Sequence, residues 1–292
     1  MRSGGRTPPR IRTYVRTDVR MHVRVHTHAR IRRSSRMSQQ YTDHHAPEGL
    51  RTRGTVVVVP GRGETRATYD RLGKRLAADA YRVRVIDAAE PSDTQLGAYM
   101  REFGERLAAA VADAAPEDGT VRPLVLLGSD TGAAALAALT GSPDSTGAPR
   151  PDALVLAGLP GDGAATSAGW DDELDVRTTC PAHRSVLTAD PGVRRGTLDG
   201  PVPQALLDAA HATVSDLPHL LLVGEDDRLA DHDGLGRLAK ALPRARHAVV
   251  HGARHDVLND QQHRSVAAEI VTFLEALRND LTPLVTVGAS AW

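Results

Sequence analysis

The sequence has one cysteine, almost no lysine and no long hydrophobic run. A single cysteine, Cys180, in 292 residues excludes an intramolecular disulfide framework and predicts a reducing compartment, which we take to be the cytoplasm. No stretch approaches the ~20 apolar residues that a membrane-spanning helix needs, and residues 1–36 lack the apolar core of a secretory signal. Lys74 and Lys240 stand beside 34 arginines, so a cluster of arginines is weak support for a binding site in this chain.

The chain also lacks a net charge, but its charge is unevenly distributed. The 36 basic and 36 acidic side chains cancel, so the overall balance favours neither nucleic acid nor an anionic membrane as a partner. Residues 1–36 hold 11 arginines and one acid, Asp18, for a net charge of +10, which leaves −10 on residues 37–292. We interpret residues 1–53 as a basic, disordered N-terminal extension, with an arm for nucleic acid or an acidic partner as the alternative.

From residue 54 onward, short aliphatic runs alternate with stretches of helical periodicity. The predicted strands cover residues 55–60, 81–87, 123–127, 153–159, 220–224 and 246–251. The predicted helices cover residues 69–80, 94–115, 133–139, 233–242 and 261–277. Strands that alternate with helices of this length require right-handed crossovers and predict an α/β fold with a doubly wound, mostly parallel sheet. Residues 54–160 and 217–280 are expected to form this core, and residues 281–292 a short tail.

The alternation stops between residues 161 and 217. This segment contains several prolines and glycines, Trp170, and one predicted helix at residues 203–212. It is too long for an ordinary connection between a strand and a helix. Because insertions of this kind leave the carboxyl edge of the sheet, where ligands bind, we predict that residues 161–216 form a short cap over a binding site. Trp170 is expected in the wall of the pocket or packed inside the cap.

Residues 123–132, P-L-V-L-L-G-S-D-T-G, join a buried strand to an alanine-rich helix through a turn flanked by Gly128 and Gly132. This pattern resembles the nucleophile elbow of the α/β-hydrolase superfamily, G-x-S-x-G. Placed on that pattern, Asp130 occupies the nucleophile position and Ser129 falls one residue early. An aspartate at this position is similar to the elbow of haloalkane dehalogenases and epoxide hydrolases.

A second loop, P-G-R-G-E at residues 60–64, resembles the H-G-x-G-E loop of monoacylglycerol lipases and lysophospholipases, with Pro60 in place of the histidine. The resemblance implies that the backbone amides of Arg62 and Thr131 form an oxyanion hole. The side chain of Arg62 is a candidate clamp for a substrate carboxylate, or else a solvated arginine. The loop has neither the G-x-G-x-x-G pattern nor the lysine of a phosphate-binding loop, so it predicts no nucleotide cofactor.

A third loop supplies an acid. V-G-E-D-D-R-L-A-D at residues 223–231 resembles the G-x-x-D turn that carries the acid of the catalytic triad. The resemblance implies Asp227 for that role, where it would orient a histidine and stabilise its charged form. Asp226, Asp231 and Asp162 are alternatives, and an acidic cluster at this place is also typical of a plain helix cap.

A fourth loop supplies a base. H-G-A-R-H-D-V-L-N-D at residues 251–260 resembles the G-x-R-H-E-x-x-N-E signature of bacterial lysophospholipases, which implies that His255 is the general base. His251 and His255 have the H-x-x-x-H spacing of a helical zinc site, but Gly252 and the preceding strand argue against a helix, so we expect no metal. In chain order the groups run nucleophile, acid, histidine, as in α/β-hydrolases.

These loops together predict a hydrolase. A carboxylate nucleophile attacks an alkyl or epoxide carbon, and water activated by histidine then hydrolyses the ester that forms. The sequence therefore predicts a cofactor-free hydrolase of a small ester-like, halide or epoxide substrate. Residues 161–217 contain no tyrosine to protonate an epoxide, and Thr131 replaces the halide-binding tryptophan of dehalogenases, a role open to Trp170. The residues expected to carry the reaction are Asp130, Asp227 and His255.

Three other functions fit the same residues. A serine esterase would need Ser129 rotated into the elbow. A non-hydrolytic binding protein or pseudoenzyme would keep the pocket without turnover. Lyase-like or cyclase-like chemistry would use Asp130 as an acid or a base, because this fold hosts many reactions. Cys180 and His183 are a candidate dyad in the cap, against a buried cysteine that only fills space.

Overall fold

The computed structural model describes Met1 and residues 41–88, 91, 95–115, 119–142, 147–163 and 168–286 of the chain. The chain divides into two compact units, Met1–Gln39 and Gln40–Trp292, and the second contains all the helices and strands described here. Most of the predicted basic extension and the end of the predicted tail therefore lie outside the described residues.

A seven-stranded sheet forms the centre of the second unit, in the order β1-β3-β2-β4-β5-β6-β7. Its strands are β1 (Tyr41–His44), β2 (Gly54–Val59), β3 (Tyr81–Ile86), β4 (Leu124–Ser129), β5 (Ala153–Ala157), β6 (His219–Gly224) and β7 (Ala245–Val250). Neighbouring strands from β3 to β7 run parallel, and β1 is antiparallel to β3. The predicted doubly wound, mostly parallel sheet is confirmed. Its order reverses at β2, and ligands of doubly wound sheets generally bind near the carboxyl ends of the strands at such a reversal.

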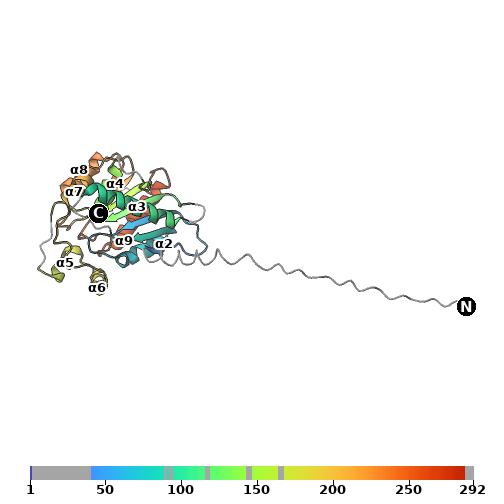
Figure 1. The fold of residues 1–292 in the computed structure, drawn as a ribbon, viewed down its shortest axis with the longest axis horizontal. Helices are drawn as coiled ribbons and strands as arrows, with labels where there is room; N and C mark the ends of the chain where they lie inside the picture. The colour runs from blue at the N-terminus through green and yellow to red at the C-terminus, as the bar shows by residue number, and fades with distance from the viewer. Residues whose placement is uncertain are drawn as a thin grey trace. The chain divides into compact units, whose positions relative to one another are not determined.

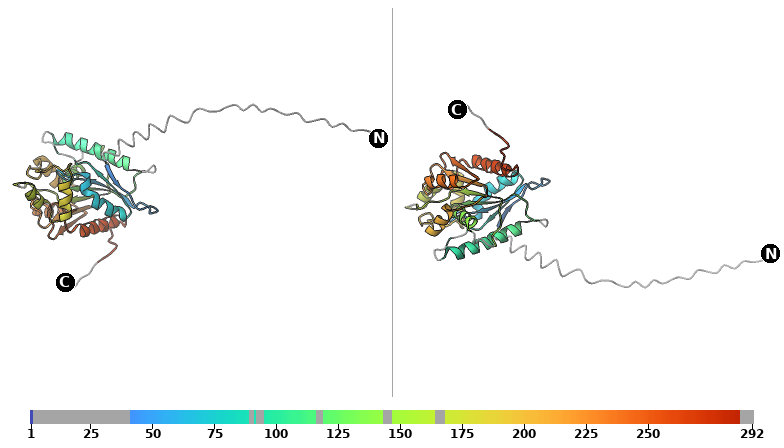
Figure 2. Two further views of the ribbon diagram at one scale, coloured as in Figure 1. Left: turned by 90° about the horizontal axis from the view of Figure 1, so that it is seen from below. Right: turned by 90° about the horizontal axis from the view of Figure 1, so that it is seen from above.

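Helices cover both faces of the sheet (Figure 1). They are η1 (Arg66–Tyr69, a 3-10 helix), α2 (Asp70–Ala78), α3 (Leu96–Ala114), α4 (Thr131–Gly141), α5 (Trp170–Arg177), α6 (Pro181–Ala189), α7 (Gln204–His211), α8 (His232–Ala241) and α9 (His263–Leu277). Alternate residues of a strand face opposite sides. Val57 and Val59 of β2 therefore pack with α3, α4, α7 and α8, whereas Val56 and Val58 pack with α2 and α9. Figure 2 shows α3 and α9 on opposite sides of the sheet.

α4 is the helix that the elbow leads into, and residues 131–139 of it are all buried. Its side chains are mostly alanine, and such small side chains let a helix pack closely on a sheet. At 11 residues it is too short to cross a membrane, and no helix in the described residues is both long and apolar enough to do so.

The predicted N-terminal extension, residues 1–53, reaches too far along the chain, because part of it belongs to the sheet. Residues 41–44 form β1, which pairs with β3 from Tyr41 opposite Ile86 to His44 opposite Val83. An ion pair fixes this edge strand, because Arg84 Nε and Nη2 lie 2.6 and 2.5 Å from the carboxylate of Asp43. Y-T-D-H has no alternation of apolar and polar residues, so periodicity does not identify it as a strand.

The predicted cap also ends too late. α7 matches the helix expected at residues 203–212, but its Leu206, Leu207 and Ala210 pack in the same core as α4. Residues of α7 therefore belong to the helical layer over the sheet. Packing, which periodicity alone does not reveal, decides this boundary.

α5 and α6 are two helices that the sequence does not predict. They lie together in Figure 1, away from α4 and α8, and Leu174, Leu187 and Val193 form a separate small core with the half-buried Trp170. The sequence of α5, W-D-D-E-L-D-V-R, places three acids in the first turn and few aliphatic residues on any face. Its helical signal is therefore the favourable charge at the N-terminus rather than an apolar stripe.

Candidate active site

The turn between β4 and α4 has the sharp backbone of a nucleophile elbow. Asp130 stands between Ser129, the last residue of β4, and Thr131, the first of α4, with φ 48° and ψ −122°. Such a conformation is strained for a residue other than glycine. The flanking glycines are required by space: a Cβ atom on Gly132 would lie 2.5 Å from the carbonyl oxygen of Val59.

The carboxylate of Asp130 is surrounded by N–H donors of one residue. The backbone amide and the Nε of Arg62 donate to Asp130 Oδ2 at 2.8 and 2.9 Å. Its Nη2 donates to Asp130 Oδ1 at 3.0 Å. The loop after β2 approaches this closely because residue 61 is glycine, on which a Cβ atom would lie 2.8 Å from the Cβ of Asp130.

His255 lies between two carboxylates. Its Nδ1 is 3.0 Å from both carboxylate oxygens of Asp227, and its Nε2 is 3.3 Å from Asp130 Oδ1. The Nε2 contact has the distance of an ion pair but not the angle of a hydrogen bond, and Nε2 has no hydrogen-bond partner among the described residues. We therefore treat the contact between His255 and Asp130 as electrostatic.

Asp227 is the candidate acid whose described contacts reach His255. It also accepts a hydrogen bond from the amide of Leu229 at 2.9 Å. Of the alternatives, Asp231 caps α8 by accepting from the amide of Gly234, and Asp162 accepts from the side chain of Gln204. The G-x-x-D pattern selects the carboxylate that faces the histidine.

Neighbouring charges shift the pKa values of both Asp130 and His255. Burial alone would raise the pKa of Asp130, but the guanidinium of Arg62 and the imidazole of His255 hold it well below its usual value. Burial alone would lower the pKa of His255, but Asp227 and Asp130 raise it to about 10. At neutral pH Asp130 is therefore ionised and His255 is protonated.

The remaining predicted site residues lie in different surroundings. Ser129 is buried and its hydroxyl is hydrogen-bonded with Tyr69. Thr131 is buried at the N-terminus of α4, where an amide has no acceptor within the helix. Trp170 donates from Nε1 to Thr188 at 3.1 Å, and Arg195 stacks on its ring at 4.8 Å, so its described contacts are within residues 161–216.

Residues of the segment between β5 and β6 hold the loop of Arg62 in place. Arg62 Nη1 donates to the carbonyl oxygen of Gly200 at 2.8 Å, and Arg177 Nη2 donates to the carbonyl oxygen of Arg62 at 2.9 Å. The amide of Arg194 donates to the carbonyl oxygen of Gly63 at 3.0 Å. The role of Arg177 is not visible in the sequence, because one arginine among 34 carries no local signal.

The positions of these groups define the class of protein. An elbow after β4, a carboxylate after β6 and a histidine after β7, at the carboxyl edge of a mostly parallel sheet, are the arrangement of an α/β-hydrolase. Residues 51–262 match the family model Hydrolase_4, described as serine aminopeptidase, S33. The chain belongs to this family.

Solved structures with the same fold include two monoacylglycerol lipases. A soluble variant of monoglyceride lipase from Saccharomyces cerevisiae, in complex with a substrate analog, is similar at a TM-score of 0.61 and 15% identity, over 81% of this chain and 91% of that one. Monoacylglycerol lipase from Paleococcus ferrophilus is similar at a TM-score of 0.59 and 18% identity, over 81% and 98%.

An α/β-hydrolase fold protein from Chitinophaga pinensis is also similar, with a TM-score of 0.58 and 13% identity over 81% of this chain and 93% of that one. At such identities these likenesses show the fold alone. A comparison with curated proteins finds no match.

Proposed function

We propose that this chain hydrolyses a small organic substrate through an ester formed on Asp130. One observation carries the proposal: Asp130 Oδ1 faces the unpartnered Nε2 of His255 at 3.3 Å, while Asp130 Oδ2 accepts the Arg62 amide at 2.8 Å. A carboxylate nucleophile attacks through one oxygen while a donor holds the other. The substrate is ester-like, a halide or an epoxide.

The proposed reaction has two steps. In the first, Asp130 Oδ1 attacks the electrophilic carbon, and the leaving group departs with the electron pair of the broken bond. In the second, His255 Nε2 takes a proton from water, and the resulting hydroxide attacks Cγ of Asp130. Negative charge then develops on Oδ2, toward which the Arg62 amide is directed, and the Thr131 amide is the second proposed donor. Collapse of this intermediate restores the carboxylate of Asp130 and releases the product, which is an alcohol from a halide or epoxide, protonated by His255. An ester substrate would instead give a mixed anhydride on Asp130, and its collapse would release a carboxylic acid.

Formation of the ester would also activate the base. While Asp130 is ionised, it and Asp227 keep the pKa of His255 near 10, so the histidine is protonated. The ester has no charge, so the contribution of Asp130 disappears and the pKa of His255 falls. The imidazole can then lose its proton and serve as the base for the second step.

The guanidinium of Arg62 favours substrates that carry a carboxylate. Its Nη2 donates to Oδ1, the attacking oxygen, at 3.0 Å, so this bond has to break before attack. A substrate with its own carboxylate would offer the guanidinium a second acceptor of the same shape. We therefore propose organic anions, such as halogenated acids or carboxylate-bearing esters, as the preferred substrates.

The second candidate function is binding without turnover. Both oxygens of Asp130 already accept N–H donors, and only 3% of Asp130 and 1% of His255 are exposed. Four cavities among the described residues are lined by other side chains. These observations favour a pseudoenzyme in which the ion pairs stabilise the fold.

A single-turnover reaction in ¹⁸O-labelled water tests the proposal. Wild-type protein in excess over 2-haloacids, epoxides and p-nitrophenyl esters is expected to incorporate ¹⁸O into Asp130, found by mass spectrometry of the peptide that contains it. Asp130→Asn should abolish turnover, whereas Asp162→Asn, a carboxylate after β5, should retain it. Turnover without label in Asp130 would exclude the covalent route. No turnover of any probe would favour the pseudoenzyme.

A further inference from the structure

Three buried side chains form a second polar cluster beside the Asp130 network. Glu64 follows β2, His183 is on α6, and Asp256 follows His255 in the loop after β7. One potential ligand atom from each of the three lies within 4.8 Å of the others, and the residues are 6%, 2% and 3% exposed. Their chemistry is that of metal ligands, one imidazole nitrogen and two carboxylate oxygens.

One oxygen of this cluster has no partner. Glu64 Oε2 accepts hydrogen bonds from the amide of Gly61 at 2.8 Å and from the hydroxyl of Tyr69. Asp256 Oδ2 is 2.8 Å from His183 Nε2, and Asp256 Oδ1 is 3.6 Å from Arg177 Nη1. Glu64 Oε1 is fully buried and has no hydrogen-bond partner among the described residues. A buried carboxylate oxygen without a partner is costly, so an occupant is expected at this position.

The charges around the cluster do not balance. Glu64, Asp256 and Glu173 supply three carboxylates, whereas Arg177, 2.9 Å from Glu173, supplies one cation. Burial, followed by the charge of Asp256, raises the pKa of Glu64 to about 7, which shows how poorly its negative charge is compensated. Uncompensated buried charge strongly destabilises a fold, and one divalent cation would compensate it.

We propose that Glu64, His183 and Asp256 bind a divalent transition-metal ion of the zinc or manganese type. Imidazole suits these ions, whereas Mg²⁺ and Ca²⁺ prefer ligand sets made of oxygen alone. Ligand atoms about 2.0–2.1 Å from a tetrahedral ion are about 3.3 Å apart. His183 and Asp256 would therefore separate slightly, and the carboxylate of Glu64 would move toward them.

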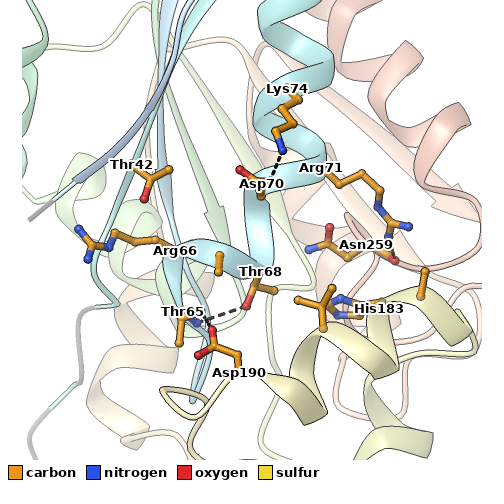
Figure 3. A pocket seen from close by; sticks show the side chains of 13 residues that line it. Thr42, Thr65, Arg66, Thr68, Asp70, Arg71, Lys74, His183, Asp190 and Asn259 are labelled. Atoms are coloured by element: carbon orange, nitrogen blue, oxygen red, sulfur yellow. Dashed lines mark hydrogen bonds and ion pairs between the residues drawn. The ribbon is translucent and has the colours of Figure 1, made fainter. Parts of the chain in front are cut away.

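Of the three proposed ligands, His183 borders a cavity of about 820 Å³ between α2 and α6. Figure 3 shows its ring beside Asn259 and close to Arg71 at this cavity. The ion would join α6 to the loops that carry Arg62 and His255. It would thereby fix these two loops of the candidate active site relative to each other. This inference does not depend on the proposed hydrolysis.

The site differs from the one that histidine spacing suggests. His251, of the H-x-x-x-H pair, is exposed and forms an ion pair with Glu225 at 3.2 Å. The residues of the proposed site lie 119 and 73 positions apart in the chain, as Glu64 to His183 and His183 to Asp256. No local pattern connects them, and the sequence for this reason predicts no metal.

Metal retention by the full chain tests the proposal. Protein stripped with a chelator is given Zn²⁺, dialysed and analysed by mass spectrometry, and its unfolding midpoint is measured with and without the metal. We expect about one tightly held equivalent and a higher midpoint with metal. Glu64→Gln and His183→Asn should each weaken binding at least tenfold. His211→Asn is the control, because His211 is a half-buried histidine on α7 bonded to the carbonyl oxygen of Pro160.

Cobalt absorption keeps the test decisive if the variants do not fold. Wild-type protein with Co²⁺ should develop the visible bands of a four-coordinate nitrogen and oxygen site, which one equivalent of Zn²⁺ should abolish and excess Mg²⁺ should leave unchanged. Wild-type protein that retains no Zn²⁺ and shows no such bands would overturn the proposal. So would folded variants that hold as much Zn²⁺ as the wild type.

Discussion

Asp130 combines a strained backbone with a carboxylate that is held on both oxygens. A residue other than glycine in this part of φ/ψ space costs on the order of 1–3 kcal/mol, and it persists only where its surroundings determine it. Here the surroundings are Arg62, His255 and the N-terminus of α4, all of which favour negative charge. Ser129, one residue earlier, faces Tyr69 and receives none of these interactions.

Removal of the charge of Asp130 is expected to destabilise the fold. Asp130→Asn leaves the buried guanidinium of Arg62 without its counter-ion, a change that costs about 3–5 kcal/mol in buried pairs. Asp70→Asn is the control, because Asp70 and Lys74 form an exposed pair worth about 0.2–1 kcal/mol. Urea denaturation of the two variants measures the difference. Equal stabilities would show that the buried pair contributes no more than a surface pair.

The pKa values of the network predict how stability depends on pH. The pKa of His255 is about 10 in the folded protein against an ordinary 6.5, so its contribution is complete below pH 6.5 and is lost as pH rises toward 10. The pKa of Asp130 is lowered by folding, so its contribution is complete above about pH 4 and is lost as pH falls.

We therefore expect the free energy of unfolding, measured with urea at pH 6, 8 and 10, to fall on the alkaline side. His255→Gln should remove that part of the fall, because glutamine does not titrate. A wild-type protein and a variant with parallel pH profiles would contradict the assigned pKa of His255.

At the scale of elements, the elbow depends on close backbone packing between β2 and α4. A Cβ atom on Gly132 would lie 2.5 and 2.6 Å from the carbonyl oxygens of Val59 and Pro60, which belong to the backbone and do not yield easily. Gly97 in α3, by contrast, has nothing within 4 Å of its Cβ position. Both glycines lie near the start of a helix. A methyl group on Gly132 would collide with the backbone of the loop after β2, whereas a methyl group on Gly97 would point into open space.

Gly132→Ala is expected to destabilise the fold by about 1–3 kcal/mol or more, the cost of adding atoms to a tightly packed core. Gly97→Ala should stabilise it by up to about 1 kcal/mol, because alanine favours helix over glycine. Thermal and urea unfolding of the two variants check the opposite signs. A neutral Gly132→Ala would show that the sheet and α4 can separate without cost.

One carboxylate, that of Asp260, holds the start of α6 against the loop after β7. Asp260 Oδ1 accepts hydrogen bonds from the amides of Thr179 and Cys180 and from the hydroxyl of Thr178, at 2.8 to 3.0 Å. Its Oδ2 accepts from the amide of Arg254, next to His255, at 2.7 Å. These bonds fix the start of α6 to the loop after β7.

Asp260→Asn is expected to loosen α6 more than the sheet, because an amide cannot accept on both sides. Hydrogen exchange of residues 178–189 should increase, while exchange of β4 and β5 stays close to wild type. Asp208→Asn, at an exposed position of α7, is the control and should leave both regions unchanged. Uniform exchange throughout the Asp260→Asn chain would mean that α6 unfolds only with the whole molecule.

At the scale of the whole molecule, the distribution of charge predicts solubility. The chain has no net charge and a pI near 7.3, so repulsion between molecules is weakest near neutral pH. A chain that starts at Met37 would carry −10 at pH 7. We expect the full chain to be least soluble near pH 7.3 in low salt, and the shorter chain to be more soluble there. Precipitation by polyethylene glycol from pH 6 to 9 measures this, and matching curves would contradict it.

Most of the core follows from local patterns. The sequence predicts β2 to β7 and helices α2, α3, α4, α7, α8 and α9 within a few residues of their ends, because each has a buried aliphatic run or an apolar face. β1 and α5 have neither, since Tyr41–His44 is a polar edge strand and Trp170–Arg177 is mostly acidic. Their positions depend on pairing with β3 and on the small core of Leu174. The cytoplasmic location and the small-molecule partner stay predictions.

The sequence by itself determined the family-defining order of elements and the four loops that carry Arg62, Asp130, Asp227 and His255, because periodicity and tight turns are properties of neighbouring residues. Only the tertiary structure decided what these groups touch. The guanidinium of Arg62 binds Asp130, 68 residues away, and Glu64, His183 and Asp256 meet from two loops and one helix. Such contacts depend on the paths of connections across the sheet edge and on the balance of buried charge, neither of which is written in any short stretch of the chain.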